Sequence, residues 1–332
     1  MSLPHVLVVS NYFEVQKHSP AAGIFVKRQI ASLERAGVKI STFDIGNSHS
    51  PLRLLSKWLQ LRRRVRQVSP DLVHGQYGTI VGLLTAFAGR PAVISFCGGD
   101  LQPGASVSSL RLTLGFLLSN LAALRADRLI CKSEQLRQAL WWRKSKAVVI
   151  PSGVDLILFS PGQRNEARKE LGWDQETPVA LLNVGDDPKG KGIDLAQAAM
   201  KVAQVRVPNA ELHIISKVDP LRVPLYFRAA DVLVCTSITE GSPNVVKEAL
   251  ACNLPVVSTS VGDVRERLAG VYPSSVVSRD PQEFGEALAK IMLSRERSNG
   301  RARIMDLGLD QVARQILSVY QSVLSVRDTG RV

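Results

Sequence analysis

The chain has 332 residues, 45% of them hydrophobic, and a formal net charge of +13. This length exceeds what a single hydrophobic core usually supports and favours two domains. No apolar run approaches the roughly 20 residues of a membrane-spanning helix, and the sparse aromatic residues form no nucleic-acid-binding motif, so we expect neither a membrane span nor a nucleic-acid partner.

Strand and helix patterns alternate through the first half of the chain. We expect strands at 5–10, 38–44, 71–74, 91–96, 127–131 and 147–150, and helices at 23–36, at 78–88 and over a long segment that ends near 126. Such alternation predicts a parallel sheet with helices on both faces. Turn-forming residues between 151 and 162 indicate the end of this domain.

A strongly basic helix is expected between 45 and 70. The segment contains no Asp or Glu, and its cations are Arg53, Lys57, Arg62, Arg63, Arg64 and Arg66. One interpretation is a helix that packs on the sheet and exposes a solvated basic face. The other adds contact with anionic lipid headgroups, where each cation contributes roughly 1 kcal/mol. We therefore expect an anionic membrane surface as a partner.

The second half repeats the alternation. We expect strands at 179–184, 210–215, 231–235 and 254–258, and helices at 192–205, 222–230, 281–293 and 310–324. The predicted fold class is α/β, with two doubly wound Rossmann-like domains that face each other across a cleft. The predicted domains are 1–155 and 156–308, and the C-terminal helix and tail, 309–332, are a candidate to cross back to the first domain.

Two carboxylates eight positions apart, Glu240 and Glu248, bracket a turn and a helix start. Ser242 is the expected N-cap, and Pro243 is the expected first helical residue. A strand pattern precedes this motif, so it lies where open α/β sheets bind ligands, and the first-turn N–H groups suit a phosphate. The alternative for the two carboxylates is a helix cap and a solvated helix residue.

The four cysteines are scattered without metal-ligand or disulfide spacing, and we expect inert thiols. The N-terminus runs directly into a strand pattern with no visible secretory signal. Both observations favour a cytoplasmic protein.

The segment from Glu240 to Glu248 resembles the E-x7-E motif of the retaining glycosyltransferases of family 4, which have two Rossmann-like domains in the GT-B fold. Further segments resemble motifs of that family in the same order: 19–29, 150–161, 191–194, 226–251 and 255–257. The chain is most similar to bacterial enzymes of surface-polysaccharide assembly, of the teichuronic-acid or capsule type.

The resemblance implies a retaining, metal-independent enzyme whose donor substrate is a nucleoside-diphosphate sugar and which uses no cofactor. Its acceptor would be a glycan, in particular a lipid-linked glycan, at the inner face of the cell membrane. Retention without an evident covalent nucleophile suggests front-face attack, in which the donor phosphate takes the acceptor's proton.

The resemblance also assigns roles to individual residues. Glu248 would bind the ribose and Glu240 would approach the donor sugar, while Lys191, with Lys189 as a second charge, would neutralise the diphosphate. The substrate-binding set is completed by Gly23 at the start of the first helix and by the turn residues Ser242, Pro243, Asn244 and Val245.

Asp100 is the second expected catalytic residue, and its alternative role is to cap the following helix. Two positions depart from the family pattern: Asp186 stands where the family usually has Arg, and Cys97 where it often has His. His74 is a candidate to replace that histidine, although a lone histidine at a strand end is more often structural. These departures support the rival interpretation, a non-catalytic nucleotide-sugar-binding or scaffold homologue at the membrane surface.

Overall fold

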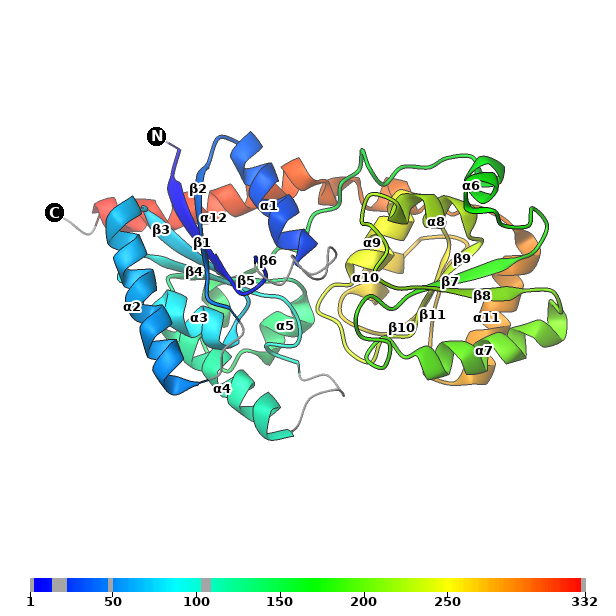
Figure 1. The fold of residues 1–332 in the computed structure, drawn as a ribbon, viewed down its shortest axis with the longest axis horizontal. Coiled ribbons are helices and arrows are strands. Elements are labelled where there is room, and N and C mark those ends of the chain that lie inside the picture. The colour runs from blue at the N-terminus through cyan, green and yellow to red at the C-terminus, as the bar shows by residue number, and fades with distance from the viewer. Residues whose placement is uncertain (1–2, 14–22, 47–49, 103–108, 330–332) are drawn as a thin grey trace. The chain divides into compact units, whose positions relative to one another are not determined.

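The computed structural model describes residues 3–13, 23–46, 50–102 and 109–329. They form two compact units, and the chain passes from the first to the second between Gly153 and Val154 and returns after Gly308. Each unit is a parallel sheet covered by helices (Figure 1), which is the predicted α/β class.

The first unit contains a six-stranded sheet in the order β2-β1-β3-β4-β5-β6, with every neighbouring pair parallel. Alternate residues of a central strand are buried on opposite faces, since Val6 and Val8 pack in one apolar cluster while Leu7 and Val9 pack in another. The strands are β1 His5–Ser10, β2 Lys39–Asp44, β3 Leu72–Gln76, β4 Ala92–Phe96, β5 Arg128–Cys131 and β6 Ala147–Val149.

Helices cover both faces of this sheet. The C-terminal helix belongs to this unit, where Val312, Ile316 and Tyr320 join the same buried cluster as Val6 and Val8. The helices are α1 Ile24–Arg35, α2 Pro51–Val68, α3 Thr79–Ala86, α4 Ser109–Arg125, α5 Glu134–Ala139 and α12 Leu309–Thr329.

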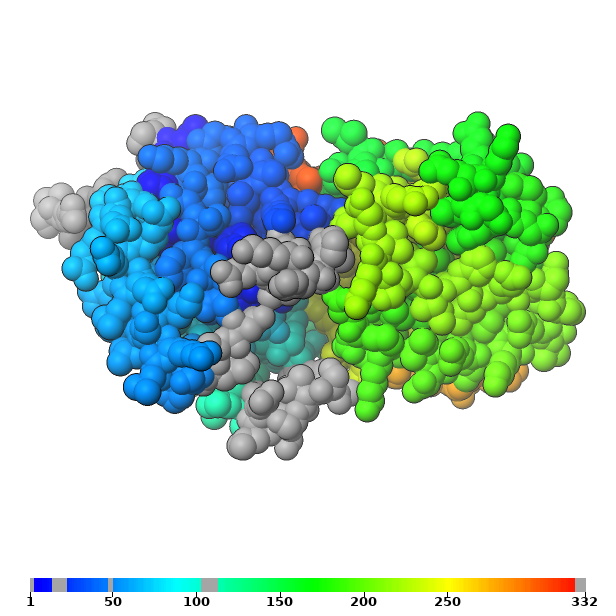
Figure 2. Space-filling view, viewed as in Figure 1, coloured from blue at the N-terminus to red at the C-terminus, as the bar shows by residue number. Residues whose placement is uncertain are grey.

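The basic helix α2 lies on the surface of the first unit (Figure 2). Only Leu61 and Val65 among its side chains are fully buried, whereas Leu55 and Leu59 are more than half exposed. Part of the apolar surface of α2 is therefore left uncovered by the sheet.

The second unit contains a five-stranded parallel sheet in the order β11-β10-β9-β7-β8. Its strands are β7 Val179–Asn183, β8 Glu211–Ile215, β9 Val232–Cys235, β10 Val256–Thr259 and β11 Ser275–Val277. Its helices are α6 Arg164–Leu171, α7 Ile193–Arg206, α8 Val223–Ala229, α9 Asn244–Ala251, α10 Val264–Leu268 and α11 Pro281–Ser294. The sequence patterns missed β11, α6 and α10, all short elements.

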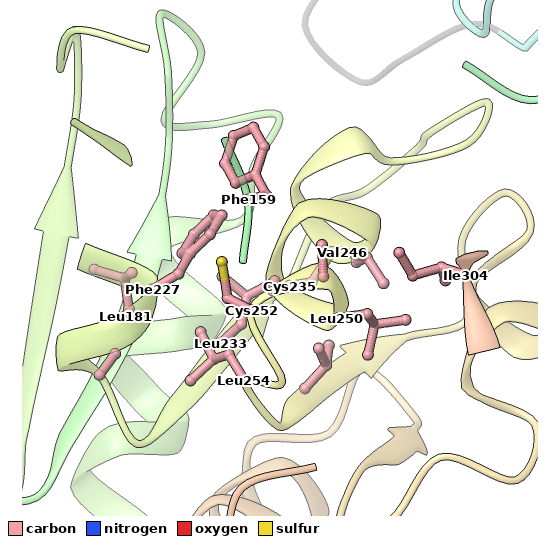
Figure 3. Packing of buried hydrophobic residues seen from close by; sticks show 14 of the residues in the cluster. Phe159, Leu181, Phe227, Leu233, Cys235, Val246, Leu250, Cys252, Leu254 and Ile304 are labelled. Atoms are coloured by element: carbon pink, nitrogen blue, oxygen red, sulfur yellow. The ribbon is translucent and has the colours of Figure 1, made fainter. Parts of the chain in front are cut away.

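The core of the second unit lies on both faces of its sheet. On one face α8 and α9 bring Phe227, Val246 and Leu250 against Leu181 and Leu233 (Figure 3). On the other face α7 and α11 cover the alternate residues of β7 and β9. The face shown in Figure 3 carries α9, the helix that follows Glu240.

A buried ionic cluster ties α6 to this sheet. Asp231 accepts hydrogen bonds from Arg164, from Arg168 and from the Val179 N–H, at 2.6, 2.7 and 2.7 Å. Arg168 has no exposed surface and also donates to the Ala229 carbonyl. A buried charge is tolerated only when it is paired in this way, so the cluster specifies how α6 packs.

Candidate functional site

The strand order of the second sheet reverses between β7 and β9. The loops that follow these two strands therefore leave the sheet on opposite sides, and at such a reversal open α/β sheets bind ligands in a crevice at the carboxyl edge. Lys191 ends the loop after β7, and Glu240 lies in the loop after β9. The topology thus brings together two residues that are 49 positions apart in the chain.

Lys191 and Glu240 form an ion pair, with Nζ 2.5 Å from Oε1. Ser237 Oγ donates a second hydrogen bond to the same carboxylate oxygen, at 2.9 Å. Burial lowers the pKa of Lys191, but the Glu240 charge and hydrogen bond outweigh burial and leave that pKa raised. The side chains keep 30% and 19% of their surface exposed, so a charged lysine is held where a ligand can reach it.

Close backbone packing holds Lys191 in this position. Gly192 has φ +69°, and a Cβ at this residue would lie 2.1 Å from the Thr236 carbonyl oxygen. Thr236 Oγ1 donates to the Lys191 carbonyl at 2.8 Å, and the Ile238 N–H donates to the Gly190 carbonyl at 2.9 Å. Only glycine permits this approach of the two loops.

The other side of the Glu240 loop is packed in the same manner. Gly262 has φ +53°, and a Cβ there would lie 2.6 Å from the Gly241 carbonyl oxygen. Arg279 donates to the carbonyls of Thr236 and Ser237, both at 2.8 Å. Sequence reasoning missed Arg279, because its position before the α11 N-cap carries no signal for contact with a loop about 40 residues earlier.

The start of α9 differs from the expectation. The helix begins at Asn244 with Pro243 as its N-cap, whereas Ser242 was the predicted cap. The Ser242 hydroxyl instead donates to Asp263 Oδ2 at 3.0 Å and lies 2.9 Å from the Lys247 ammonium. This network explains the error, since it occupies the hydroxyl that would otherwise cap the helix.

The first turn of α9 therefore has no side-chain cap, and its N–H groups at Asn244 and Val245 remain suited to an anion. Asn244 Oδ1 is buried and has no hydrogen-bond partner within the described part of the chain. Glu248 is half-buried one turn further along the same helix.

Lys189, the second cation that was expected to neutralise the diphosphate, is placed differently from Lys191. Lys189 is exposed, and its carbonyl accepts from the Gly192 N–H at 3.0 Å. Asp186 is exposed as well, while Asp187 Oδ1 accepts from the Gly190 N–H at 2.9 Å. The two lysines of this loop thus differ, because within the described residues Lys191 alone of the two has an ion-pair partner.

Asp100 lies in the first unit and is almost fully buried, with 1% of its surface exposed. Its carboxylate accepts from the N–H groups of Gly78, Cys97 and Gly98 at 2.8 to 3.1 Å. Burial raises the pKa of Asp100, and these hydrogen bonds oppose the rise. The geometry favours an anchor for the loops after β3 and β4 over the expected catalytic role, because both oxygens are already engaged.

His74 is also structural in this arrangement. Its Nδ1 lies 2.6 Å from Tyr320 Oη, and its Nε2 lies 2.8 Å from Ser95 Oγ. Burial lowers the pKa of His74 to about 3, so the ring is neutral. Burial of the Cys97 thiol raises its pKa to about 12, which leaves this side chain neutral as well.

Gly23 is the N-cap of α1 and adopts φ +65°. Its carbonyl accepts from the Val26 N–H at 2.9 Å, so the helix starts directly at this glycine. The preceding part of the expected loop motif, 19–22, lies outside the described residues.

Two protein-family models match the chain. Residues 7–157 match the model described as Glycosyltransferase Family 4, and residues 166–294 match the model described as Glycosyl transferases group 1. The chain belongs to glycosyltransferase family 4. The resemblance inferred from the sequence motifs is therefore confirmed.

Curated relatives agree with this family assignment. A D-inositol 3-phosphate glycosyltransferase from Geodermatophilus obscurus is 30% identical over 54% of this chain and 48% of its own length. The putative teichuronic acid biosynthesis glycosyltransferase TuaC from Bacillus subtilis is 25% identical over 82% of this chain and 85% of its own length. The chain spans about half the length of the first of these relatives.

Solved structures show the same fold. The sucrose-phosphate synthase of Thermosynechococcus elongatus superposes with a TM-score of 0.79 at 20% identity, covering 97% of this chain and 100% of its own. Anabaena HepE in complex with UDP and glucose gives 0.69 at 17% identity, covering 96% and 100%. These similarities support the GT-B fold with two Rossmann-like domains. Among the described residues, no helix combines the length and apolar character needed to cross a membrane.

Proposed function

We propose that this protein is a retaining glycosyltransferase that moves a sugar from a nucleoside-diphosphate sugar to a glycan acceptor. The observation that carries the proposal is the Lys191–Glu240 ion pair at the strand-order reversal of the second sheet, in a chain of family 4. A charged lysine at such a crevice supplies what a leaving nucleoside diphosphate requires.

The second unit would bind the donor. Lys191 and the uncapped N–H groups at the start of α9 would receive the diphosphate, because both present positive charge. Glu248 would accept from the ribose hydroxyls, and Glu240 would meet the donor sugar. Asn244 Oδ1, which is buried without a partner among the described residues, would accept from a donor hydroxyl.

No metal or cofactor enters this proposal. Lys191 and the helix start would stabilise the developing charge of the leaving diphosphate, the role that a divalent cation fills in other transferases. We propose front-face attack with retention, in which the acceptor hydroxyl passes its proton to the donor phosphate as the glycosidic bond to that phosphate breaks.

The proposed acceptor is a lipid-linked glycan of surface-polysaccharide assembly at the cytoplasmic face of the membrane. The named function of the TuaC relative supports this proposal, and so does the basic surface of α2. Binding of the wild-type protein to vesicles with and without anionic phosphatidylglycerol tests the membrane part. Equal binding to neutral and anionic vesicles would refute it.

Glu248→Ala tests the donor site. We expect sugar transfer to be abolished while the circular dichroism spectrum and thermal melting stay those of the wild type. Glu266→Ala, which removes an exposed carboxylate from α10 in the same unit, is the matched control and should retain full transfer. Unchanged transfer by the Glu248 variant would contradict the assignment of Glu248 to the donor site.

A donor panel completes the test. Transfer and donor hydrolysis are measured across nucleotide sugars with and without EDTA, and the anomeric configuration of the product is determined by NMR. We expect EDTA-insensitive transfer with retention. Loss of transfer in EDTA with recovery on adding Mg²⁺ would refute metal independence, and an inverted product would refute retention.

The second candidate is a non-catalytic nucleotide-sugar-binding or scaffold homologue. The neutral Cys97 thiol and the engaged Asp100 carboxylate favour it, because neither presents a charged group to a substrate. A ligand that binds only the native state raises its melting temperature. Stabilisation by nucleotide sugars without transfer or hydrolysis of any donor would support this candidate over the enzyme.

A further inference from the structure

A second basic site lies in the first unit. It is a pocket of about 440 Å³ formed by α2, by the turn between α3 and β4, and by the end of α4. Its lining residues are Trp58, Arg62, Ala86, Phe87, Gly89, Arg90, Arg125 and Asp127. Arg90 and Asp127 lie just before β4 and β5, so the pocket lies at the amino edge of the sheet, opposite the carboxyl edge where Cys97 lies.

The pocket has an excess of positive charge. Arg62, Arg90 and Arg125 line it, and within the described residues none of the three forms an ion pair. Asp127 is the single carboxylate among the lining residues, and its Oδ2 accepts from the Ala92 N–H at 2.8 Å. Arginine guanidinium groups provide the paired N–H donors that bind phosphate oxygens most strongly, and three arginines line this one pocket.

Trp58 gives this pocket a fixed wall. Its Nε1 donates to the Phe87 carbonyl at 3.0 Å, which joins α2 to the turn after α3. The Arg62 guanidinium carbon lies 5.2 Å from the centre of the Trp58 ring. Stacking on an aromatic face orients the planar guanidinium before a ligand arrives, so less side-chain entropy is lost on binding.

Exposed apolar side chains lie on two of the helices that contribute to this pocket. On α2, Leu55 and Leu59 share a helical face with Arg62 and are 53% and 54% exposed. On α4, Leu117, Leu121 and Leu124 precede Arg125 and are 38% to 49% exposed. A free phosphate would need no such rim, whereas a lipid places acyl chains beside its headgroup.

We propose that this pocket binds the phosphate of an anionic glycerophospholipid headgroup. Arg62, Arg90 and Arg125 hold the phosphate, and the leucines of α2 and α4 contact the acyl-chain boundary of the bilayer. The proposal deepens the proposed membrane association, since it replaces a diffuse basic surface by one defined site.

Charge-conserving variants separate a defined site from diffuse attraction. Arg62→Lys, Arg90→Lys and Arg125→Lys together keep the net charge but remove the fork-shaped donors. Arg53→Lys, Arg63→Lys and Arg66→Lys, three exposed positions of α2, form the matched control. Binding to phosphatidylglycerol–phosphatidylcholine vesicles is measured by co-sedimentation at fixed ionic strength, and donor hydrolysis or binding is measured on the same samples.

We expect the pocket variant to bind these vesicles about tenfold more weakly than the wild type, and the control variant to change less than about twofold. Equal binding by both variants would overturn the pocket and leave the membrane association intact. Failure of the wild type to bind anionic vesicles would overturn both the lipid-binding pocket and the membrane association. Donor-site activity should be the same in all three proteins, which separates this proposal from the proposed transfer reaction.

A second experiment, in solution without vesicles, distinguishes a lipid ligand from free phosphate. Thermal melting is measured with inorganic phosphate in the wild type and in the pocket variant, against sodium chloride of equal ionic strength. Phosphate stabilisation that only the wild type shows, combined with unchanged vesicle binding by the pocket variant, would assign the site to a free anion and overturn the lipid proposal.

Discussion

The carboxyl edges of the two sheets use acidic residues in opposite ways. In the second unit, Glu240 keeps 19% of its side chain exposed and pairs with a charged lysine. In the first unit, Asp100 is 1% exposed and accepts from three backbone N–H groups. A carboxylate is therefore partly accessible to a ligand in the second unit and occupied by loop N–H groups in the first. Its hydrogen-bond partners make this difference.

Two lysines extend this comparison. Lys191 is held beside a carboxylate that outweighs burial and leaves its pKa raised. Lys132 is 2% exposed, its pKa is lowered by burial, and its ammonium lies 3.5 Å from the Gln29 amide oxygen. A buried lysine without an ion-pairing carboxylate tends toward its neutral form, so Lys191 is the better cation for a diphosphate.

The largest expected effect tests the anchoring role of Asp100. Asp100→Ala leaves three N–H groups without their acceptor, and we expect the free energy of unfolding to fall by about 3 kcal/mol. Glu240→Ala should cost less than about 1 kcal/mol, because its carboxylate is partly solvated. Urea unfolding followed by circular dichroism compares the two. Equal losses would remove the distinction drawn between these carboxylates.

The next test compares the lysines of the loop after β7. Lys191→Met should lower kcat/KM about 100-fold, or about 2.7 kcal/mol, because it removes charge from the leaving-group site. Lys189→Met is the matched control at an exposed neighbouring position, and we expect a change below about threefold. Steady-state kinetics with the best donor of the panel checks both values. Similar losses would mean that both cations contact the diphosphate.

The pH dependence of stability tests the buried His74. Its pKa is about 3 in the folded protein, against 6.5 for an unperturbed histidine, so the unfolded chain binds an extra proton between these two pH values. The part of the unfolding free energy that depends on a neutral His74 is fully present above pH 6.5, and it declines as the pH falls toward 3. Between about pH 7.5 and 5 the wild type should lose about 2 kcal/mol more than His74→Gln. Parallel curves of unfolding free energy against pH would contradict the neutral histidine.

The smallest expected effect concerns Arg279, which supports the Glu240 loop through two carbonyls. Arg279→Gln should lower kcat about fivefold, or about 1 kcal/mol, with KM little changed, because the loop rather than the ligand is affected. Arg279→Lys should restore part of the rate. A rise in KM alone would place Arg279 on the substrate instead.

Much of the fold could be predicted because strand and helix patterns are local. The strand 5–10 was predicted at its observed bounds, and most helices were placed to within a few residues. The short strand β11 and the helices α5, α6 and α10 were missed, since such short segments carry too little periodicity. Their positions depend instead on tertiary contacts, such as the Arg164 and Arg168 bonds to Asp231.

Residues of the candidate site could be singled out from the sequence where they belong to a contiguous motif. Contacts between residues that are distant in the sequence could not be predicted. Glu240, Glu248 and Lys191 were singled out from the sequence, but neither the pairing of Lys191 with Glu240 nor the contact of Arg279 could be inferred from it. Ser242 was wrongly predicted as the α9 cap, because Asp263 and Lys247 compete for its hydroxyl.

The sequence by itself determined the alternation of strands and helices, the two-domain division and the membership of family 4, since each rests on the order of residues along the chain. Tertiary structure decided which charged groups are exposed and which are already engaged. The reason is physical: the availability of a side chain and its pKa depend on burial and on partners that the fold brings from elsewhere. The exposure of Glu240 and Asp100 shows this for availability, and Lys191 and Lys132 show it for the pKa.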